Sequence, residues 1–498
     1  MKKIFDNKHI YVPFLILLFL FVSYLVSDCF FDNDGYWIIA SGKYIVENGI
    51  PKTNPFTFVK DLEIIIQQWP WAIYCYKIYS SFGNIGIYIS SMIFFLLNLI
   101  VFYRLARLKD SHAKITTTFA ILIFLTCYVF ISIRPTMITV LLLGLEIYIL
   151  EYYRKTNKSW ILLFLVLISF LEINLHSAIW FLHFVFMLPY LVPPIKNPFV
   201  LFKEDNIRRK PLFLILIPMT LVSLLNPYGL KGILYIVYSF GDKLDSANIS
   251  ELGCWGLKSF YGLLIIASLI ILAIICTKNK YHEKRIDAAT FYLFCGTAIM
   301  GILYIRNLVY FCFGCIILFI ELIKDVNFEK VNTWIEHQIK YTCLYVWVIV
   351  VLFICLFYKD WQKTITTDAD EINTVPAKIV EYLDEKNVDK STRIYTEFNT
   401  GGYFEFKGYH CFIDARPELY FKELNKKDDV FADYTTLTST SSKKKLKKIL
   451  EKYNFEYLCV SKDDLLDAYL KSDSDYKYIM SDKNSKMHLY QINLNTRN

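Results

Sequence analysis

Two aspartates, Asp32 and Asp34, stand two residues apart in the stretch FFDNDGYW, soon after the first long apolar run. A D-x-D pair can take a proton from a reacting group, or send two carboxylates to one divalent cation such as magnesium or manganese. Short clusters of aspartate and asparagine also form ordinary turns beside helices, with their carboxylates in water. The pair by itself therefore leaves a catalytic site, a metal site and a capping turn open.

Four further places put polar residues into otherwise apolar sequence. Arg134, in SIRPTM, is either an interfacial side chain or a phosphate ligand. Arg306, in YIRNLVYF, repeats that pattern, and two arginines at a membrane boundary can clamp a lipid phosphate. A histidine at a helix end and a carboxylate in a loop also have common structural roles. Because placing a polar group in or beside a membrane-spanning segment costs free energy, we take these residues as functional candidates. The further candidates are Glu172, Asn174, His176, Glu251 and Asn307.

Long apolar runs provide the elements that must hold these residues. The chain of 498 residues is 55% hydrophobic and has a mean hydropathy of +0.36. The first run, residues 10–27, has no small-residue cleavage site after it and is predicted to be a retained span. The sequence predicts a mainly α, polytopic membrane protein with about 11 transmembrane helices. The ten further spans are predicted at about residues 84–103, 115–133, 135–150, 159–175, 177–192, 211–226, 259–276, 288–304, 307–323 and 341–358.

The distribution of basic residues predicts the orientation. With a cytoplasmic N-terminus, the inner segments hold 22 lysines and arginines, and the outer segments before residue 359 hold nine. This bias follows the positive-inside rule and places the C-terminal segment outside. The inner loops also account for the formal charge of +8, so no nucleic-acid partner is needed to explain it.

Two predicted outer segments interrupt the spans. The first, residues 28–83, contains GYWIIASGKYIVENG, whose apolar side chains fall near one face of a helix that could lie in the membrane interface. A second interfacial helix is predicted at QQWPWAIYCYKIYSSFG, whose tryptophans suit the headgroup level. The second outer segment, residues 226–258, opens with the turn signal NPYG.

Beyond a linker at residues 359–371, residues 372–498 predict a small extracytoplasmic α/β domain. Strands are expected at RIYTEF, HCFID, EYLCVS and KMHLYQIN, and helices at VPAKIVEYLDEK and SSKKKLKKILEKY. Gly401 and Gly402 permit a tight turn. Asp414 and Arg416 are expected to form an ion pair that orders a loop.

Several familiar catalytic motifs are missing from the sequence. It has no G-x-S-x-G, no H-E-x-x-H, no Walker motif and no paired Cys/His spacing for zinc. Cys312 and Cys315 fall within an apolar run, where packing is the expected role. The sequence therefore argues against the nucleotide chemistry of soluble enzymes.

As a whole, DNDGYWIIASGKYIVENGIPKTNPFTF resembles the first outer loop of bacterial polytopic membrane proteins of the C-type glycosyltransferase superfamily. That loop typically reads D-x-D, aromatic-Trp, Gly, G-I-P, Thr and P-F-[ST]. The matching residues are Asp32, Asp34, Trp37, Gly42, Gly49, Pro51, Thr53, Pro55 and Phe56. Ile38 and Ala415 depart from the pattern, where the family often has His and Gly. Later motifs follow in the family's order, at Gln68-Trp69, Arg134-Pro135, Asn174-Leu175-His176, Asn226-Pro227-Tyr228-Gly229, Arg306-Asn307, Gly401-Gly402-Tyr403 and Asp414-Ala415-Arg416.

The resemblance implies a multi-pass enzyme of the bacterial plasma membrane that builds the cell envelope. It implies transfer of a sugar from a polyprenyl-phosphate-linked donor lipid to an extracytoplasmic acceptor. Asp32 or Asp34 would act as general base or bind a divalent cation, and Arg134 and Arg306 would hold the lipid phosphate. The further catalytic candidates are His176 and Glu251, and the further substrate-binding candidates are Trp37, Gln68, Asn174, Asn226, Tyr228 and Asn307.

A non-enzymatic transporter, or an envelope-assembly scaffold with a degenerate glycosyltransferase fold, is the alternative interpretation. A transporter is expected to carry ionisable groups near the middle of the bilayer. The candidates above cluster at one predicted face instead, which favours chemistry on a lipid headgroup.

Overall fold

The computed structural model describes residues 8–28, 31–126, 128, 131–196, 198–239, 260–281, 285–324, 326, 339–367, 370 and 375–493. The chain divides into two compact units. The first comprises residues 1–30, 88–226 and 245–365, and the second comprises residues 31–87, 227–244 and 366–498.

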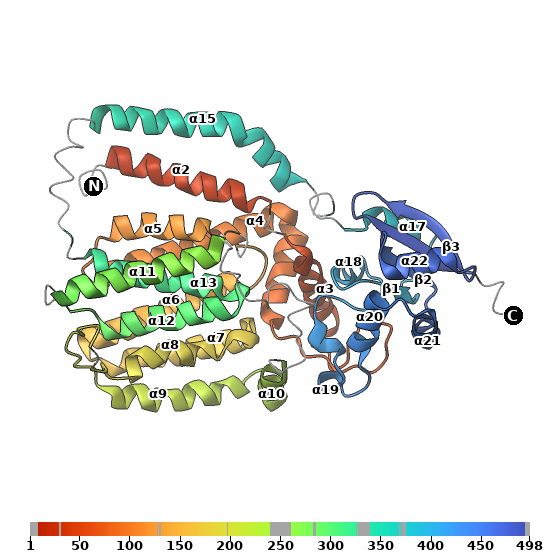
Figure 1. Cartoon of the computed structure of the whole chain (residues 1–498), viewed down its shortest axis with the longest axis horizontal. Coiled ribbons are helices and arrows are strands. Elements are labelled where there is room, and N and C mark those ends of the chain that lie inside the picture. Colours follow the sequence, from red (N-terminus) through yellow and green to blue (C-terminus); the bar gives the residue numbers. More distant parts are fainter. Residues whose placement is uncertain are drawn as a thin grey trace. The chain divides into compact units, whose positions relative to one another are not determined.

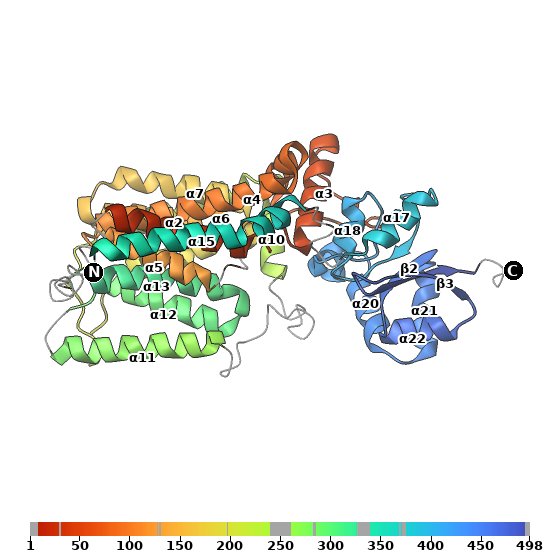
Figure 2. The ribbon, with the colours of Figure 1, turned by 90° about the horizontal axis from the view of Figure 1, so that it is seen from above.

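The first unit is helical, and its long helices run side by side (Figures 1 and 2). Helix α4 (Trp69–Leu108) begins in the second unit, breaks at Gly83, where φ is 61°, and continues into the first. The other helices of this unit are α2 (Lys8–Val26), α5 (Ala113–Leu125), α6 (Thr136–Thr156), α7 (Leu163–Leu175), α8 (Leu182–Leu191), α9 (Arg209–Leu221), α11 (Phe260–Tyr281), α12 (Ala288–Leu303), α13 (Leu308–Ile323) and α15 (Ile339–Thr366).

Every predicted span falls on one of these helices. Among the described residues, four helices are long and apolar enough to cross a membrane, and six shorter apolar helices accompany them. The mainly helical fold is therefore confirmed, whereas the count of about 11 spans stays a prediction.

Helix α13 forms the centre of the first unit. It is apolar on all sides and buried along most of its length, as expected for a helix surrounded by other helices. The ring of Phe313 packs against those of Phe102 and Phe186. A Cβ at Gly314 would lie 2.1 Å from the hydroxyl oxygen of Thr297, so this glycine lets α12 and α13 approach closely.

The second unit combines the first predicted outer segment with the C-terminal region. Its sheet has the strand order β1-β2-β4-β3, with β1 parallel to β2 and the other pairs antiparallel. The strands are β1 (Ile394–Tyr395), β2 (Tyr457–Ser461), β3 (Tyr476–Asp482) and β4 (Met487–Ile492). The helices are α3 (Asn33–Asn48), α10 (Leu230–Ser239), α17 (Ala377–Glu385), α18 (Gly401–Phe406), α19 (Lys422–Asn425), α20 (Val430–Ser439), α21 (Lys443–Tyr453) and α22 (Leu465–Ser472).

One hydrophobic core holds this unit together. Ala40 and Ile45 of α3 and Ile64 of the loop before α4 share it with Phe412 and Leu458 of the C-terminal region. The apolar face of α3, which we expected to lie against lipid, is therefore covered at least in part by protein. The sequence also predicts an apolar stripe on α21, and its residues Leu446, Ile449, Leu450 and Tyr453 are buried as expected. The boundaries predicted for the linker and the C-terminal domain stay predictions.

In the C-terminal region two local predictions were wrong and one strand was missed. HCFID is not a strand of the sheet, because the backbone N–H of Cys411 instead donates to the carbonyl of Phe56, 2.9 Å away. The edge strand β3 was missed because its side chains are mostly half-exposed and lack a strong apolar alternation. Gly401 and Gly402 do not form a turn but begin α18.

Candidate functional site

Both aspartates of the D-x-D pair lie at the start of α3. Asp32 is the N-cap of the helix, and its carboxylate accepts a hydrogen bond from the backbone N–H of Gly35, 3.1 Å away. The carboxylate of Asp34 accepts from the indole N–H of Trp37 at 3.2 Å. The capping turn considered from sequence is therefore present. It uses an oxygen of each carboxylate and does not exclude a second role.

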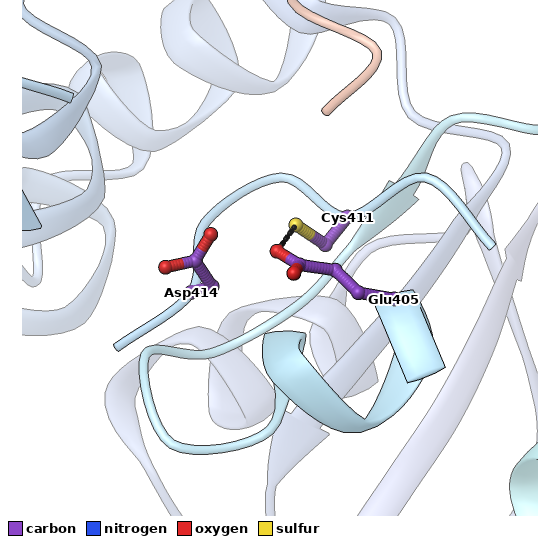
Figure 3. A group of neighbouring side chains, drawn as sticks. All are labelled: Glu405, Cys411 and Asp414. Atoms are coloured by element: carbon purple, nitrogen blue, oxygen red, sulfur yellow. Dashed lines mark hydrogen bonds between the residues drawn. The ribbon is translucent and has the colours of Figure 1, made fainter. Parts of the chain in front are cut away.

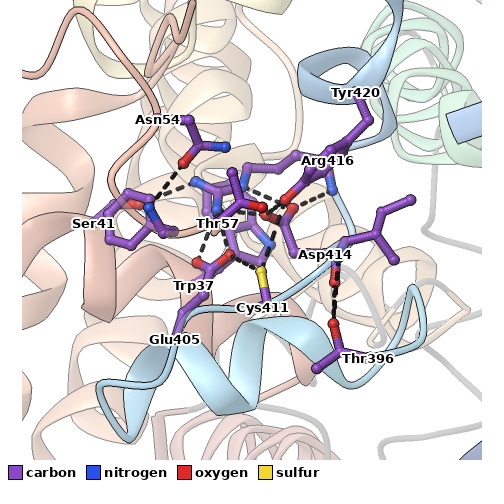
Figure 4. Close-up of polar contacts among 12 residues, drawn as sticks. Trp37, Ser41, Asn54, Thr57, Thr396, Glu405, Cys411, Asp414, Arg416 and Tyr420 are labelled. Carbon is purple, nitrogen blue, oxygen red and sulfur yellow. Dashed lines mark hydrogen bonds and ion pairs between the residues drawn. The ribbon is translucent and has the colours of Figure 1, made fainter. Parts of the chain in front are cut away.

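Trp37 connects this helix to the D-A-R motif of the C-terminal region. The guanidinium carbon of Arg416 lies 4.7 Å from the centre of the Trp37 ring, a cation–π contact. Arg416 also donates to the hydroxyl of Ser41 on α3 at 3.3 Å (Figure 4).

Two buried carboxylates hold Arg416. Its Nη2 atom donates to both oxygens of Glu405, at 2.9 and 2.8 Å, and to Asp414 at 2.8 Å (Figure 4). Its Nε atom donates to Asp414 at 2.9 Å, and the hydroxyl of Tyr420 donates to Asp414 at 2.6 Å. The expected ion pair between Asp414 and Arg416 is present, as part of a fully buried network.

The charges of this network set its protonation. Burial raises the pKa of Glu405 well above its ordinary value. Burial alone would also raise the pKa of Asp414, but the adjacent Arg416 guanidinium holds it below its usual range. Arg416 therefore stands beside both carboxyl groups as the cation of this buried network.

Among the described residues, one group of three side chains could hold a metal ion by ligand type: Glu405, Cys411 and Asp414, whose ligand atoms lie within 4.8 Å of one another (Figure 3). The surroundings do not favour a metal. Arg416 already donates to both carboxylates. Burial raises the pKa of the Cys411 thiol well above its ordinary value, so the thiolate that would bind a metal is disfavoured. We interpret this group as a structural ion-pair network.

The glycine pair of the G-G-Y motif permits close packing. A Cβ on Gly401 would lie only 1.8 Å from the backbone oxygen of Ile413, and one on Gly402 would lie 3.3 Å from the Cβ of Trp37. The hydroxyl of Tyr403, next in the motif, donates to Asp370 at 2.8 Å. Gly401 and Gly402 therefore let α18 pack closely against Ile413 and against Trp37 of α3.

A second polar cluster lies within the first unit, where α6 and α7 meet. The hydroxyl of Thr139 lies 2.6 Å from Glu172 Oε1 and 2.7 Å from His176 Nδ1. Arg306 is near enough for its charge to act on His176 and on Tyr310. The structure thus brings together three of the residues predicted from sequence, Glu172, His176 and Arg306.

Glu146 and His183 extend this cluster, and the sequence analysis missed both. His183 Nδ1 is paired with Glu146, and His183 Nε2 lies 3.5 Å from Glu172 Oε2. The side chains of all three residues are completely buried. The signal was available, because an ionisable residue inside each of the predicted spans 135–150 and 177–192 is a functional candidate by default.

The remaining predicted residues have the following places. The side-chain amide of Asn174 donates to the carbonyls of Phe170 and Leu225, at 2.9 and 3.4 Å. The amide of Asn226 donates to the carbonyl of Ser223 at 2.8 Å. The amide of Asn307 donates to the carbonyl of Met300 at 3.2 Å. The hydroxyl of Tyr228 accepts from the backbone N–H of Ile66 at 3.1 Å. Gln68 and Arg134 are half-buried, just before α4 and α6. Glu251 lies outside the described residues.

These residues do not all belong to one compact unit. Asp32, Asp34, Trp37, Gln68 and Tyr228 lie in the second unit. The candidates of the first unit are Arg134, Glu172, Asn174, His176, Asn226, Arg306 and Asn307. Their shared membership in one site stays a prediction.

Segments predicted to lie inside the cell converge at another place in the first unit. Lys109 lies 3.1 Å from Glu151 and 3.7 Å from Glu321, and Arg154 pairs with Glu151 and Asp287. These groups line a polar cavity of about 240 Å³. Because acidic and basic groups alternate around it, we interpret the cavity as part of an ion-pair network that ties the helix ends together.

The fold is that of a polytopic helical protein joined to a small α/β region, and comparisons with solved structures make it more specific. No family model matches the chain, and no curated protein matches it. The crystal structure of the Archaeoglobus fulgidus oligosaccharyltransferase tethered with an acceptor peptide containing the NVT sequon matches with a TM-score of 0.55 and 12% identity, over 90% of this chain and 69% of that chain.

A second structure has the same fold. The archaeal oligosaccharyltransferase AglB from Archaeoglobus fulgidus, in complex with an inhibitory peptide and a dolichol-phosphate, matches with a TM-score of 0.53 and 12% identity, over 91% of this chain and 69% of that chain. At this identity the likeness defines the fold. The chain has the fold of a membrane enzyme, an oligosaccharyltransferase, which agrees with the resemblance seen in its motifs.

Proposed function

We propose that this chain is a membrane glycosyltransferase that moves a sugar from a polyprenyl-phosphate-linked donor to an acceptor outside the cytoplasm. The observation that carries the proposal is the oligosaccharyltransferase fold, which extends over 90% of the chain. The structures with this fold were solved with an acceptor peptide or with a dolichol-phosphate, so their ligands have the chemistry that the proposal requires.

The proposed reaction needs a base and a positive charge. The acceptor must lose a proton as its oxygen or nitrogen attacks the sugar, and we assign this role to Asp32 or Asp34. The lipid phosphate leaves with negative charge, and we assign its stabilisation to Arg134 and Arg306. His176 and Glu251 remain secondary catalytic candidates, with Trp37 among the candidates for substrate binding.

A divalent cation is compatible with the aspartate pair. Two carboxylates are hard oxygen ligands of the kind that magnesium and manganese prefer. No group of three metal-ligating side chains includes Asp32 or Asp34 in the described part of the chain. A cation held there would therefore need oxygen ligands from water or from the donor phosphate, which is a common arrangement for magnesium. When bound, it would neutralise charge on that phosphate.

One observation favours the alternative of a transporter. Glu146 lies near the middle of α6 and is fully buried beside His183 and Glu172. Ionisable groups at such a depth are typical of proton-coupled transporters. The enzyme remains the better supported proposal, because a buried proton-holding group also suits a reaction that releases a proton.

The direct test uses the purified full chain in lipid vesicles. The donor is a polyprenyl phosphate carrying a radiolabelled sugar, and the acceptor probe is a peptide containing an Asn-Val-Thr sequon. Transfer of label from the lipid to the peptide or to water supports the proposal, and a parallel polyprenyl-diphosphate donor identifies the phosphate class. No release of label from either donor, together with proton-coupled uptake of a solute into the vesicles, would replace the enzyme with the transporter.

A further inference from the structure

Four buried polar side chains and the partly exposed His176 form a continuous series inside the first unit. In order, they are His176, Thr139, Glu172, His183 and Glu146, and they come from α6, α7, α8 and the turn after α7. Successive contacts are 2.7 Å, 2.6 Å and 3.5 Å, followed by the hydrogen bond between His183 and Glu146. From His176 to Glu146, each side chain thus lies within 3.5 Å of the next one, although the helices around them are apolar.

Donor and acceptor can be assigned to the hydrogen bonds within this series of side chains. A threonine hydroxyl has one proton to donate, and the 2.6 Å contact to Glu172 is shorter than the 3.3 Å contact to the carbonyl of Pro135. With Glu172 ionised, Thr139 donates to it and accepts from the Nδ1–H of His176. His176 Nδ1 is 4.0 Å from Glu172, too far for a direct hydrogen bond, so the threonine bridges them.

The inner part of the series holds two carboxyl groups around one imidazole. His183 stands between Glu146 and Glu172, and all three side chains are completely buried. If both carboxyl groups are ionised and His183 carries a positive charge, the three groups keep one excess negative charge in a region of low dielectric. Within the described part of the chain, the atoms Glu146 Oε1, Glu172 Oε2 and His183 Nε2 make no hydrogen bond. An added proton would neutralise the group. Among the described residues, Arg306 and Tyr310 are further charged or titratable groups near Glu172 and His176.

We propose that this series of side chains is a proton relay, which delivers a proton from His176 to Glu172. A proton binds to Nε2 of His176, the Nδ1 proton passes to the oxygen of Thr139, and the hydroxyl proton of Thr139 passes to Oε1 of Glu172. One proton enters and one carboxylate becomes a carboxylic acid, so charge and atoms balance. His176 is the entry point because its side chain is 14% exposed, whereas that of Glu172 is fully buried.

The relay gives the first unit a role in the reaction, and this part of the inference rests on the proposed function. Glycosyl transfer releases the acceptor's proton, and the carboxylate that first takes it must lose it again before the next turnover. The relay provides Glu172 as a temporary acceptor for that proton. His176, Thr139 and Glu172 are then positioning and proton-transfer residues, and the first base remains an aspartate of α3.

The first test does not require glycosyl transfer. Infrared difference spectra of the full chain in vesicles, recorded between alkaline and acidic pH, should show the C=O stretch of a buried carboxylic acid. Glu172→Gln should remove this signal. After a rapid drop in pH, Thr139→Val should slow its appearance at least about 10-fold, because the bridging hydroxyl is lost.

Thr117→Val is the matched control. Thr117 is also buried in an apolar helix and donates to the carbonyl four residues earlier, at 2.9 Å, but it lies outside the relay. It should leave both the signal and its rate unchanged. Equal rates in the Thr139 and Thr117 variants, or a signal that survives Glu172→Gln, would overturn the relay. Unfolding temperatures of all variants establish that each one is folded.

The second test measures the pH profile of transfer. Thr139→Val should lower the turnover rate about 100-fold without changing KM, and Thr117→Val should change neither. If the wild-type protein transfers no sugar, the proposed function fails, but the infrared experiment still decides on the relay. If transfer proceeds with an unchanged profile in Thr139→Val, the relay has no part in the reaction.

Discussion

The guanidinium carbon of Arg416 lies 4.7 Å from the centre of the Trp37 ring, although the two residues are far apart in the sequence. Trp37 is held in turn by the carboxylate of Asp34, which accepts from its indole N–H. The D-x-D motif at the start of α3 is therefore linked through one aromatic ring to the D-A-R motif of the C-terminal region. A change in either motif is expected to affect the other.

Replacing Arg416 should destabilise the second unit strongly. Arg416→Ala removes the cation that faces Glu405 and Asp414, and leaves these carboxylates buried without their charge partner. Breaking a buried pair in this way costs about 3–5 kcal/mol. The measurement is the unfolding temperature of the full chain in detergent.

Lys447→Ala is the control for Arg416→Ala. Lys447 lies 3.8 Å from Asp475 and its side chain is 56% exposed, so its loss should cost at most about 1 kcal/mol. Equal unfolding temperatures for the two variants would show that the buried network contributes nothing to stability.

Gly401→Ala should also lower stability, although it adds only a methyl group. The new Cβ would lie 1.8 Å from the backbone oxygen of Ile413, and a backbone atom cannot move as a flexible side chain can. We expect a loss of about 1–3 kcal/mol or more, measured as a lower unfolding temperature. Gly296→Ala, in helix α12, meets no atom within 4 Å and should be neutral. A neutral Gly401→Ala would contradict the close packing of α18.

The sequence predicted the helical membrane unit well because a long uncharged run has few structural options. Such a run must satisfy its own backbone hydrogen bonds, so each predicted span became a helix. The stripe of α21 was equally clear, since Leu446 and Leu450 repeat at helical spacing and are buried. These features depend on neighbours in the sequence.

The features that the sequence did not reveal depend on neighbours in space. Gly401 was interpreted as a turn residue, but its position is set by the carbonyl of Ile413. HCFID alternates like a strand, yet its backbone pairs with Phe56 outside the sheet. Glu146 and His183 could each have been noticed as ionisable residues within predicted spans, but their pairing joins two different spans and depends on the fold.

Acid should weaken the C-terminal region through Asp467. Its carboxylate contacts Lys471, His488 and Tyr490 at 2.7, 2.9 and 2.6 Å. Burial alone would raise the pKa of Asp467, but the hydrogen bond from Lys471 and those from its other partners lower it to about 2. Because this value is below the unfolded pKa of about 3.9, the stabilisation is complete above that pH. It is lost as the pH falls toward 2.

The experiment compares the unfolding temperatures of wild type and Asp467→Asn between pH 2 and pH 7. The difference should be largest above about pH 4 and shrink toward pH 2, because the Asp467 carboxylate of the folded wild type becomes protonated as the pH approaches its pKa. Asp61→Asn is the control, since Asp61 is 73% exposed and lies 3.9 Å from its partner Lys427. A difference for Asp467→Asn that stays constant with pH would rule out the ionised carboxylate as its source.

The D-x-D pair can be separated into its structural and its chemical roles. Asparagine caps a helix about as well as aspartate and can accept the indole hydrogen bond, but it has no charge and is a poor base. We therefore expect Asp32→Asn/Asp34→Asn to unfold at the wild-type temperature and to transfer sugar at least about 100-fold more slowly. Asp32→Ala should instead cost about 1 kcal/mol of stability through the lost cap.

Removal of divalent ions then distinguishes a base from a metal ligand. If the aspartates bind a cation, a chelator should abolish wild-type transfer, and magnesium or manganese should restore it. If they act as a base, transfer should persist in the chelator. Full activity in the double asparagine variant would contradict both roles. Asp32 and Asp34 would then serve only to begin α3 and to hold Trp37 beneath Arg416.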